Sequence, residues 1–347
     1  MSAKTENALD EPEQAIVKYE IVCANDCASL FLHNNHIMKP RITVVGSVNM
    51  DLVFRTPRMP AIGETLHGHE FRQIPGGKGA NQAVAAARQG AEVRFIGAVG
   101  DDGFGEFARQ CLNRESIQTA LLATVSGIAT GVAGILVEDT GDNCIVLAAG
   151  ANATVSEAQM EQAADSIAAA QMLLCQLETP LASVSKAIRI AHERGVKVVL
   201  NPAPAQDLPT ELLRRVDYLI LNETEASQLS DISVTDHQTG QRASESLLAM
   251  GVGVVILTMG GQGALLTTAN GTQLIPAVKV EVVDTTAAGD TFVGAFAVGI
   301  ANGLPVTKAC IEAQYTAALT VTRLGAQTSI PQRSEVLALM KERQAAR

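Results

Sequence analysis

Two kinds of hydrophobic pattern alternate along most of the chain. Short runs of branched apolar residues predict strands, and longer Ala-rich segments with apolar residues every three or four positions predict helices. The strand-like runs are ITVVG at 42–46, VRFIGAV at 93–99, MLLCQL at 172–177, VKVVL at 196–200, YLILN at 218–222 and VVILTMG at 254–260. The helix-like segments are 80–90, 156–170, 180–195 and 244–251. Because strand and helix alternate, we expect an α/β fold, a three-layer sandwich with a mostly parallel central sheet.

Two segments interrupt this alternation with strand-like runs that have no helix between them. They cover about residues 51–75 and 130–148, and Gly141 with Asp142 has the composition of a hairpin turn. We expect these segments to form a small second sheet that projects from the large one. A flap beside the carboxyl edge of a parallel sheet is well placed to cover a ligand, so we expect a β-sheet lid.

Residues 1–40 show neither pattern, and the first of them are mostly polar and acidic. We therefore expect an N-terminal extension outside the core fold, followed by one core domain over residues 41–343. The extension contains four residues of types that bind zinc, Cys23, Cys27, His33 and His36. The interval from the cysteines to the histidines is far shorter than the ~12 residues of a zinc finger, which disfavours a zinc site.

Composition narrows the class of protein. The 347 residues are 47% hydrophobic and 18% charged, as in a folded enzyme-sized protein, and the net charge of -10 disfavours nucleic acid and anionic membranes as partners. Several of the six cysteines lie in apolar runs, which is typical of reduced, buried thiols and predicts a cytoplasmic protein. No apolar stretch reaches the ~18 residues of a membrane span, and no secretory leader is recognisable.

The strongest chemical signal is DTTAAGDTFVGAFAVG at residues 284–299. Small residues, Ala287, Ala288 and Gly289, lead into a predicted helix, so backbone N–H groups at its start are free to bind an anion. Asp290 falls in the first turn, where a carboxylate is stabilised as an anion and can accept a proton from an attacking hydroxyl. Asp290 would fit equally well as a simple helix cap, and the sequence alone leaves that alternative open.

A second signal is GGKGANQAVAAARQG, which begins at Gly76. Glycines allow a ligand to approach the backbone, and Lys78 and Asn81 offer donors to hydroxyl or phosphate oxygens. The spacing is not that of a Walker A loop. A tight turn before a helix is the alternative interpretation.

A third signal is GSVNMD at residues 46–51. Asn49 and Asp51 are two residues apart, so in an extended segment they point to the same side and suit neighbouring hydroxyl groups. Asn and Asp also occur in turns for conformational reasons alone. The dinucleotide fingerprint GxGxxG is missing after this strand, which disfavours a Rossmann-type dehydrogenase.

Weaker candidates follow other predicted strands. Glu178, Asn222, Glu225 and Thr258 with the GGQG that comes after it all stand near strand ends, where ligands bind in open α/β sheets. Each of them alone fits an ordinary loop. GDDGFG at 100–105 carries two carboxylates that would repel a phosphate, so we interpret it as a turn and helix start.

Together these motifs resemble the PfkB-type sugar kinases, and within that family the ribokinases. The resemblance runs from Ile42 to Gln332 and is carried by GGKGANQAVAA, DTTAAGDTF, NPAPA at 201–205, LNETEA at 221–226 and VTRLGAQTS at 321–329. It implies transfer of the ATP γ-phosphate to the terminal 5-hydroxyl of a sugar, foremost D-ribose. It also implies Mg²⁺, an activating K⁺ ion and a homodimer formed through the β-sheet lid.

The resemblance assigns roles to individual residues. Asp290 matches the catalytic base, and Ala288 and Gly289 match the anion hole. The sugar-contacting positions correspond to Asn49, Asp51, Gly77, Lys78, Asn81, Glu178 and Asp290. The nucleotide-contacting positions correspond to Asn222, Thr258, Gly260, Gly261, Gly263, Gly289 and Gln314, and Glu225 matches the magnesium and phosphate network. The potassium loop corresponds to Asp284, Thr286, Thr320, Arg323, Gly325 and Ser329.

Related functions stay open at this point. A kinase for 2-deoxyribose, fructose, a ketodeoxy sugar acid or a nucleoside would share most of these motifs, although the aromatic content of 3% offers few rings to stack a base. A non-catalytic sugar-sensing protein on the same fold is the alternative from another class. The intact Gly289-Asp290 pair and Glu225 argue against it.

Overall fold

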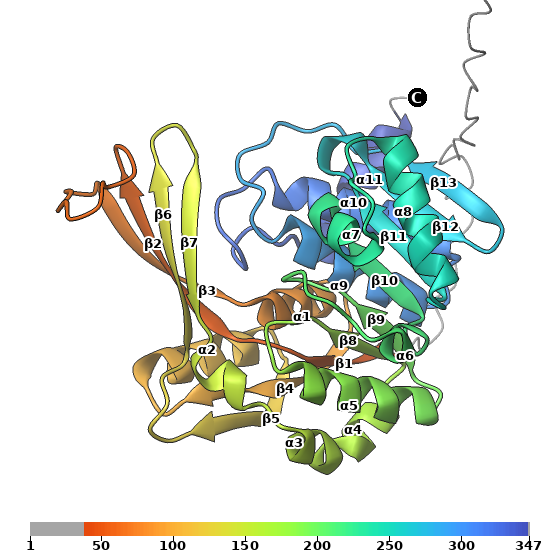
Figure 1. Ribbon diagram of the computed structural model, residues 1–347, viewed down its shortest axis with the longest axis horizontal. Helices are drawn as coiled ribbons and strands as arrows, with labels where there is room; N and C mark the ends of the chain where they lie inside the picture. The colour runs from red at the N-terminus through yellow and green to blue at the C-terminus, as the bar shows by residue number, and fades with distance from the viewer. Residues whose placement is uncertain (1–37, 346–347) are drawn as a thin grey trace, which may run out of the picture.

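The larger of two sheets forms the centre of the molecule (Figure 1), of which the computed structural model describes residues 38–345. Its nine strands are β1 (Arg41–Val45), β4 (Glu92–Gly100), β5 (Gln118–Val125), β8 (Met172–Cys175), β9 (Lys197–Leu200), β10 (Tyr218–Leu221), β11 (Val254–Thr258), β12 (Ala264–Thr268) and β13 (Gly271–Ile275). Their spatial order is β13-β12-β11-β10-β9-β8-β1-β4-β5. All pairs from β11 to β5 are parallel, and β12 and β13 add an antiparallel edge.

Side chains of the central strands alternate between two hydrophobic cores. Val44 of β1 and Leu174 of β8 belong to one core, and Val45 and Cys175, the next residue of each strand, belong to the other. All four are fully buried. A strand buried on both faces must be apolar at nearly every position, which is why the predicted strands read as continuous apolar runs.

Helices cover both faces of this sheet (Figure 1). Those packed on the first core are α1 (Lys78–Arg88), α2 (Gly103–Arg114), α9 (Ala288–Ala301) and α10 (Val306–Thr320). Those packed on the second core are α3 (Glu157–Gln162), α4 (Ala164–Ala168), α5 (Leu181–Glu193), α6 (Thr210–Leu213), α7 (Glu223–Ser230) and α8 (His237–Ala249). The C-terminal helix α11 (Arg333–Ala345) packs on α10 through a small third cluster that includes Tyr315, Val336 and Met340.

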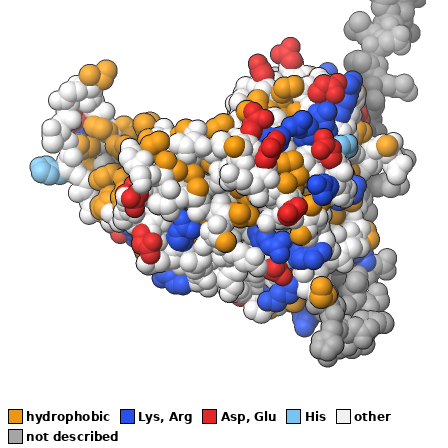
Figure 2. Space-filling view, turned by 90° about the horizontal axis from the view of Figure 1, so that it is seen from below, with side chains coloured by type: hydrophobic (Ala, Val, Ile, Leu, Met, Phe, Trp, Pro, Cys, Tyr) orange, Lys and Arg blue, Asp and Glu red, His pale blue; other side chains and the backbone are white. Residues whose placement is uncertain are grey.

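The smaller sheet has four strands and projects from this body (Figure 1). It consists of β2 (Asn49–Thr56), β3 (Glu70–Gly76), β6 (Gly131–Glu138) and β7 (Asn143–Ala148), in the order β3-β2-β6-β7. The predicted hairpin is present, because β6 and β7 pair antiparallel and Gly141 between them has a φ of 96°. Figure 2 shows apolar side chains gathered on this projecting part. The predicted α/β fold class with a large, mostly parallel sheet and a smaller sheet is confirmed.

Hydrogen bonds of Asn152 and Asp102 tie the root of the small sheet to the body. The Asn152 side chain, in the 3-10 helix η2 (Gly150–Thr154), accepts a hydrogen bond from Val48 N at 2.9 Å and donates to Asn49 Oδ1 at 2.7 Å. Asp102 accepts bonds from Thr130 N at 2.8 Å and Thr130 Oγ1 at 2.6 Å. Asp102 also caps the N-terminus of α2, which confirms that GDDGFG is a turn and helix start.

Some predictions cannot be compared with this architecture. Residues 1–37 lie outside the described residues, and with them lie most of the predicted extension and the four Cys and His residues at 23, 27, 33 and 36. In the described part of the chain, no helix has the length and hydrophobicity needed to cross a bilayer.

Candidate active site

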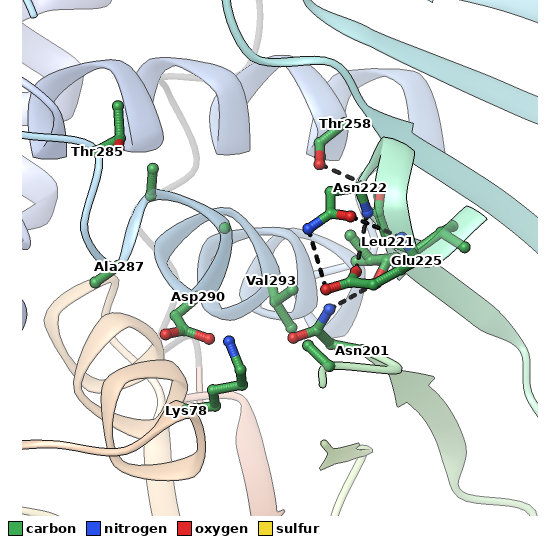
Figure 3. Close-up of a pocket in the computed structure, with 14 residues that line it drawn as sticks. Lys78, Asn201, Leu221, Asn222, Glu225, Thr258, Thr285, Ala287, Asp290 and Val293 are labelled. Carbon is green, nitrogen blue, oxygen red and sulfur yellow. Dashed lines mark hydrogen bonds between the residues drawn. The ribbon is translucent and has the colours of Figure 1, made fainter. Parts of the chain in front are cut away.

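A cavity of about 210 Å³ opens beyond the carboxyl ends of β9, β10 and β11 (Figure 3). It is lined by Lys78, Asn201, Ala203, Ile220, Leu221, Asn222, Glu225, Thr258, Thr285, Ala287, Ala288, Gly289, Asp290 and Val293. These residues come from the start of α1, from the loops after three parallel strands and from the start of α9. A cavity at this edge of an open α/β sheet is the expected place for a ligand.

The start of α9 supplies a site for an anion. Ala287 precedes the helix in a left-handed conformation with a φ of 60°, and no side chain caps the first turn. The first N–H groups of a helix have no carbonyl partner within it and carry its positive dipole end. A Cβ added to Gly289 would meet no atom within 4 Å, so space is open beside this turn. Ala288 and Gly289, the predicted anion hole, are thus both exposed to the cavity.

Asp290 is held by two amides of α1. Its Oδ2 accepts a hydrogen bond from Asn81 Nδ2 at 3.0 Å, and its Oδ1 accepts one from Gln82 Nε2 at 3.1 Å. The side chain therefore points away from its own helix terminus and toward α1. The simple helix-cap interpretation is wrong, because Asp290 caps nothing and instead joins two helices at the cavity wall.

The pKa of Asp290 reflects two opposing effects. Burial raises it above the ordinary value, and the nearby Glu178 carboxylate raises it further. The Lys78 ammonium and the bonds from Asn81 and Gln82 lower it, but burial outweighs them. A carboxylate whose pKa is raised, but which still has donors on both oxygens, is suited to accept a proton near neutral pH.

Lys78 is the cation of this cluster. Figure 3 shows its ammonium pointing toward the Asp290 carboxylate. Burial lowers the pKa of Lys78, but the carboxylates of Asp290, Glu178, Glu225 and Asp51 together raise it above its ordinary value. Lys78 is therefore charged and able to neutralise a negative group in the cavity.

Glu178 connects three elements near the root of the small sheet. Its Oε2 accepts hydrogen bonds from Ser47 Oγ at 2.5 Å, Asn49 Nδ2 at 3.4 Å and Lys78 N at 3.1 Å. The structure thus brings Glu178, Asn49 and Lys78 together although they are far apart in the sequence.

Asp51 lies in the same group of charges. Its pKa is raised to about 7 by burial first, and by repulsion from Glu178 and Asp290, against the opposing effect of Lys78. Three carboxylates and one ammonium therefore share this region, and one of the carboxyl groups is half protonated near neutral pH.

Glycines allow the chain to turn between the small sheet and α1. Gly77 has a φ of 92°, and an added Cβ would lie 2.7 Å from Asn49 N and 2.9 Å from Ser47 O. At Gly76 an added Cβ would lie 2.3 Å from Asp51 Oδ2. Any larger residue would separate the strand that carries Asn49 and Asp51 from the helix that carries Lys78 and Asn81.

Asn222 and Glu225 form a capping box at the start of α7. Glu225 Oε2 accepts from Asn222 N at 3.0 Å, and Asn222 Oδ1 accepts from Glu225 N at 2.9 Å. Both side chains line the cavity, and burial raises the pKa of Glu225. They have a structural role whatever they bind.

The other predicted nucleotide-contacting residues are more dispersed. Thr258 lines the cavity and donates to Leu221 O at 3.2 Å. Gly260 and Gly261 follow in the 3-10 helix η3 (Gly260–Gln262), and Gly263 ends it with a φ of 99°. These glycines and Gln314, which lies on α10, are not among the cavity-lining residues.

The predicted potassium residues lie in two segments that Asp284 joins. Asp284 Oδ1 accepts from Thr286 N at 2.9 Å, and Oδ2 accepts from Gly325 N at 2.9 Å. The remaining predicted residues have other partners: Thr320 Oγ1 donates to Thr291 Oγ1, Arg323 pairs with Glu335, and Ser329 Oγ donates to Ala326 O. Among residues 38–345, no group of three or more His, Cys, Asp or Glu is arranged to hold a metal ion.

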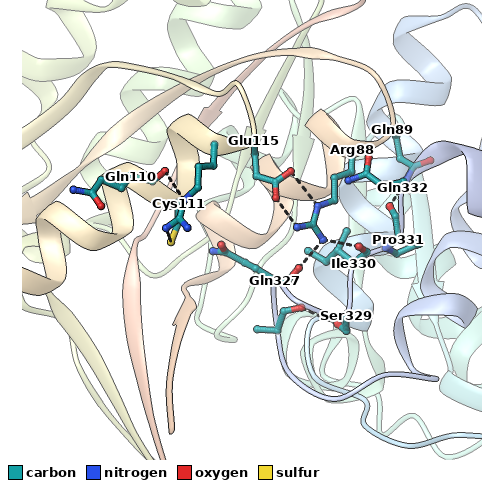
Figure 4. Close-up of polar contacts among 12 residues, drawn as sticks. Arg88, Gln89, Gln110, Cys111, Glu115, Gln327, Ser329, Ile330, Pro331 and Gln332 are labelled. Atoms are coloured by element: carbon teal, nitrogen blue, oxygen red, sulfur yellow. Dashed lines mark hydrogen bonds and ion pairs between the residues drawn. The ribbon is translucent and has the colours of Figure 1, made fainter.

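Arg88 anchors the loop that contains Gly325 and Ser329 (Figure 4). Its Nη1 donates to Gln327 O at 2.7 Å and to Ile330 O at 2.6 Å, and its Nη2 pairs with Glu115 at 2.5 Å. The neighbouring Gln89 Nε2 donates to Pro331 O at 3.0 Å. The C-terminal end of α1 therefore holds this loop, while its N-terminal end holds Asp290.

Several site residues were missed from the sequence. Gln82 bonds Asp290, Ser47 bonds Glu178, and Asn152 bonds Asn49. Asn201 was noted only as part of a motif. The available signal was weak, because a polar residue that stands among apolar neighbours, as Gln82 does in NQAVAAA, is unusual in a buried helix but does not reveal its partner.

Comparison with known proteins agrees with this geometry. The model of the pfkB family carbohydrate kinase matches residues 39–333. The chain is 43% identical over 304 residues to the ribokinase of Haemophilus influenzae, covering 88% of this chain and 99% of that protein. It is 44% identical over 306 residues to the ribokinase of Schizosaccharomyces pombe, covering 85% of this chain and 96% of that protein.

A solved structure is similar over the same region. The structure of Arabidopsis thaliana ribokinase complexed with ribose and ATP matches with a TM-score of 0.83 at 31% identity. The match covers 88% of this chain and 99% of that one.

Proposed function

The chain belongs to the pfkB family of carbohydrate kinases, and we propose that it transfers the γ-phosphate of ATP to the 5-hydroxyl of D-ribose. The products are D-ribose 5-phosphate and ADP. The observation that carries this proposal is the position of Asp290, which is fixed by two amides, faces Lys78 and adjoins the start of α9. This arrangement combines a base with two positive groups at one wall of the cavity.

The reaction needs little covalent chemistry from the protein. Asp290 takes the proton of the 5-hydroxyl as its oxygen forms a bond to the γ-phosphorus, and the bond from that phosphorus to the β-phosphate oxygen breaks. The leaving ADP keeps the electron pair. Lys78 and the free N–H groups at the start of α9 offset the charge on the transferring group, which is the main demand of phosphoryl transfer.

The sugar is bound between the root of the small sheet and the start of α1. Asn49, Asp51, Gly77, Lys78, Asn81 and Glu178 provide a dense set of donors and acceptors there. Asn81 Oδ1 is buried and, among the described residues, has no hydrogen-bond partner. A buried acceptor without a partner is costly, so a sugar hydroxyl that donates to it would make the free energy of sugar binding more favourable.

ATP occupies the cavity beside Asn222, Thr258 and the start of α9 and extends beyond it toward Gly260, Gly261, Gly263 and Gln314, which do not line the cavity. Mg²⁺ fits here as an ion that keeps several waters and binds mainly through phosphates. Glu225 faces this region with both oxygens already bonded to Asn222, so it would act on a bound Mg²⁺ indirectly. When bound, Mg²⁺ neutralises the phosphate charge.

K⁺ is the proposed activator, held by the two segments that Asp284 joins. Thr286, Thr320, Arg323, Gly325 and Ser329 contribute mainly through backbone oxygens, and an all-oxygen donor set fits a hard monovalent cation. The first of these segments leads directly into Ala288, Gly289 and Asp290. Ordering this segment would therefore order the start of α9.

The small sheet serves as a lid over the sugar and as the contact of a homodimer. Its edge strand β7 is exposed along its whole length, and Ile145, Val146 and Leu147 are 59%, 72% and 44% exposed. Phe54 and Phe71, paired on neighbouring strands, are exposed as well. Contiguous exposed apolar side chains on an edge strand are costly in a monomer, and a second copy would cover them.

Two further proposals concern the domain bounds and the cellular location. Residues 41–343 form the kinase domain, residues 1–40 are an extension, and the protein acts in the cytoplasm. The location is supported by the thiols of Cys111, Cys144, Cys175 and Cys310, which are all free. Oxidising compartments favour paired cysteines.

The test is ADP formation by the purified protein with Mg²⁺ and a panel of D-ribose, 2-deoxyribose, fructose and a nucleoside, with and without K⁺. We expect the highest kcat/KM with D-ribose, an increase with K⁺, and a product whose phosphate is on carbon 5 by ³¹P and ¹³C NMR. A higher kcat/KM for another sugar would overturn the substrate but keep the kinase. Ribose binding with no turnover would favour the sugar-sensing alternative.

A further inference from the structure

A chain of buried amides lies behind Asp290, outside the residues that line the cavity. Gln176, just after β8, donates from Nε2 to Gln82 Oε1 at 2.5 Å. Gln82 in turn donates from Nε2 to Asp290 Oδ1 and to Asn201 Oδ1, both at 3.1 Å. Both glutamines have an exposed fraction of 0%.

The Gln82 amide has partners on both of its polar atoms, whereas Gln176 Oε1 is buried and, among the described residues, has no hydrogen-bond partner. Because Gln176 donates to the Gln82 oxygen, the Gln82 NH₂ group must face the Asp290 carboxylate. The reversed Gln82 amide would place its oxygen against Asp290 Oδ1 and its NH₂ against the Gln176 NH₂. Both glutamine side chains are fully buried, so the reversed arrangement would lose several hydrogen bonds.

Gln82 is not placed to bind the sugar. Its side chain is fully buried and its Oε1 already accepts from Gln176, whereas its partners Asp290 and Asn201 line the cavity. Its two donated bonds end on these residues. Any effect of Gln82 on the reaction must therefore pass through the base.

We propose that Gln82 is a positioning residue for Asp290, and that Gln176 acts through it by fixing the direction of the Gln82 amide. Gln82 holds one carboxylate oxygen while Asn81 holds the other, which aims the base at the hydroxyl. This inference rests on the proposed kinase function with Asp290 as base.

Loss of the Gln82 donor also changes the ionisation of the base. The charged groups that face Asp290 are Lys78 on α1, Glu178 after β8, Asp51 on β2 and Glu225 on α7. Lys78 lowers the pKa of Asp290, and the carboxylates raise it. Without Gln82 the anion loses a stabilising bond, so the acid limb of the kcat profile moves to higher pH.

The first experiment compares Gln82→Met with Gln159→Met. Gln159 is a control, because it is a glutamine of α3 whose NH₂ group donates to two backbone carbonyls, Gly97 O and Leu121 O, and it belongs to no proposed site. Gln82→Met should lower kcat about 10- to 100-fold, with ribose Kd within about twofold by calorimetry because no sugar contact is lost. The midpoint of the acid limb of the kcat–pH profile should move up by about one pH unit. Gln159→Met should lower Tm, because it also loses partly buried hydrogen bonds, and leave kcat and the pH profile unchanged.

A double-mutant cycle tests the role of Gln176 and remains informative if Gln82→Met folds poorly. Gln176→Met should lower kcat by a smaller factor, about 3- to 10-fold, again with unchanged ribose Kd. In the Gln82→Met background the same substitution should have no further effect on kcat. Independent, multiplying effects of the two substitutions would contradict the relay.

The outcomes separate this inference from the proposed function. If the wild-type protein does not phosphorylate ribose, the function fails. If wild type turns over and Asp290→Asn does not, but Gln82→Met has the kcat and pH profile of wild type, only the positioning role fails. A rise in ribose Kd equal to the loss in kcat/KM would also overturn it, since that result indicates sugar binding.

Discussion

The two parts of the molecule that meet at the proposed sugar site are built in opposite ways. Where α1 meets α9, Asp290 is buried, and donors from Asn81 and Gln82 hold both of its carboxylate oxygens. The small sheet is exposed instead, with apolar side chains such as Val146 that have little to pack against. The proposed base is therefore held in place without a ligand, whereas the proposed lid leaves apolar side chains uncovered.

This difference matches the demands of phosphoryl transfer. The base and the anion site must be in place at the moment of reaction, because reorganising them would raise the barrier. The proposed lid would have to open to admit a sugar and close to exclude water, and segments that move in this way are generally among the less stable parts of a fold. The root of the small sheet is tied to the body by hydrogen bonds of Asn152, Asp102 and Glu178.

The largest expected effect comes from a substitution of Asp290, the proposed base. Asp290→Asn removes the base, so kcat should fall by about 10³-fold or more, while ribose binding is retained because the sugar has several other partners. Stopped-flow or coupled ADP assays and calorimetry measure the two quantities. Asp165→Asn, an exposed residue of α4, is the control and should match wild type. Near-normal turnover by Asp290→Asn would remove it from the base role.

The next effect concerns the boundary between the two parts. The pKa of Asp51 is raised to about 7 in the folded protein, so the folded state keeps a proton that the unfolded state releases near 4. The free energy of unfolding should therefore fall as pH rises from about 4 to about 7, by on the order of 2 kcal/mol. In Asp51→Asn the free energy of unfolding should decrease less over this pH range. The same substitution should weaken ribose binding by about 10- to 100-fold.

Urea titrations of both proteins at pH 5 and pH 8 provide the comparison. Ribose affinity of the wild type should rise as pH passes about 7, because the Asp51 anion is the stronger acceptor. Equal pH dependence of stability in wild type and Asp51→Asn would show that Asp51 is not the perturbed group.

A third substitution tests whether the small sheet forms the contact of a dimer. Ile145→Glu on β7 should shift the protein from dimer to monomer in sedimentation experiments, because it places a charge in the proposed contact. KM for ribose should rise several-fold, to about 10-fold, with kcat little changed and the stability of the body intact. Ile128→Glu is the control, because Ile128 is exposed but lies outside the small sheet. A monomeric wild type, or an unchanged dimer in Ile145→Glu, would exclude this contact.

The smallest effect on activity comes from the far end of α1. Arg88→Met removes two bonds to the loop carbonyls and the pair with Glu115, so it should lower the free energy of unfolding by about 2–3 kcal/mol. Half-maximal K⁺ activation should require about two- to fivefold more K⁺, since the loop is held less firmly.

Arg109→Met is the matched control for this substitution. Arg109 also donates to two backbone carbonyls, Thr119 O and Leu122 O, but far from this loop. It should lower stability by a similar amount without changing the K⁺ dependence. Equal K⁺ dependence of both variants would show that the contacts of Arg88 do not influence the proposed K⁺ site.

The contrast between the two parts also explains what could be predicted from sequence. Strands such as β1 and β8 are buried on both faces, so their apolar runs are unmistakable, and Asp290 stands directly after small residues that begin a helix. These signals are local. The fold class and the position of Asp290 in the first turn of a helix followed from them.

The contacts of Asp290 could not be predicted in the same way. Gln82 lies 208 positions earlier in the chain, and only the packing of α1 on α9 brings the two together. For Asn222 and Glu225 the spacing in the sequence fits both a capping box and a ligand site, so the sequence could not choose between them. The structure contains the capping box. Sequence thus identifies the residues that begin elements better than the partners that tertiary packing gives them.

The most direct test of the account is a structure of the protein with D-ribose and a non-hydrolysable ATP analogue. We predict that the 5-hydroxyl lies within about 3 Å of an Asp290 carboxylate oxygen, with the γ-phosphate group at the start of α9. The bonds from Asn81 and Gln82 to Asp290 should be unchanged while the small sheet moves toward the sugar. A ribose whose 5-hydroxyl faces away from Asp290, or an Asp290 that must break these bonds to reach it, would contradict a base organised in advance.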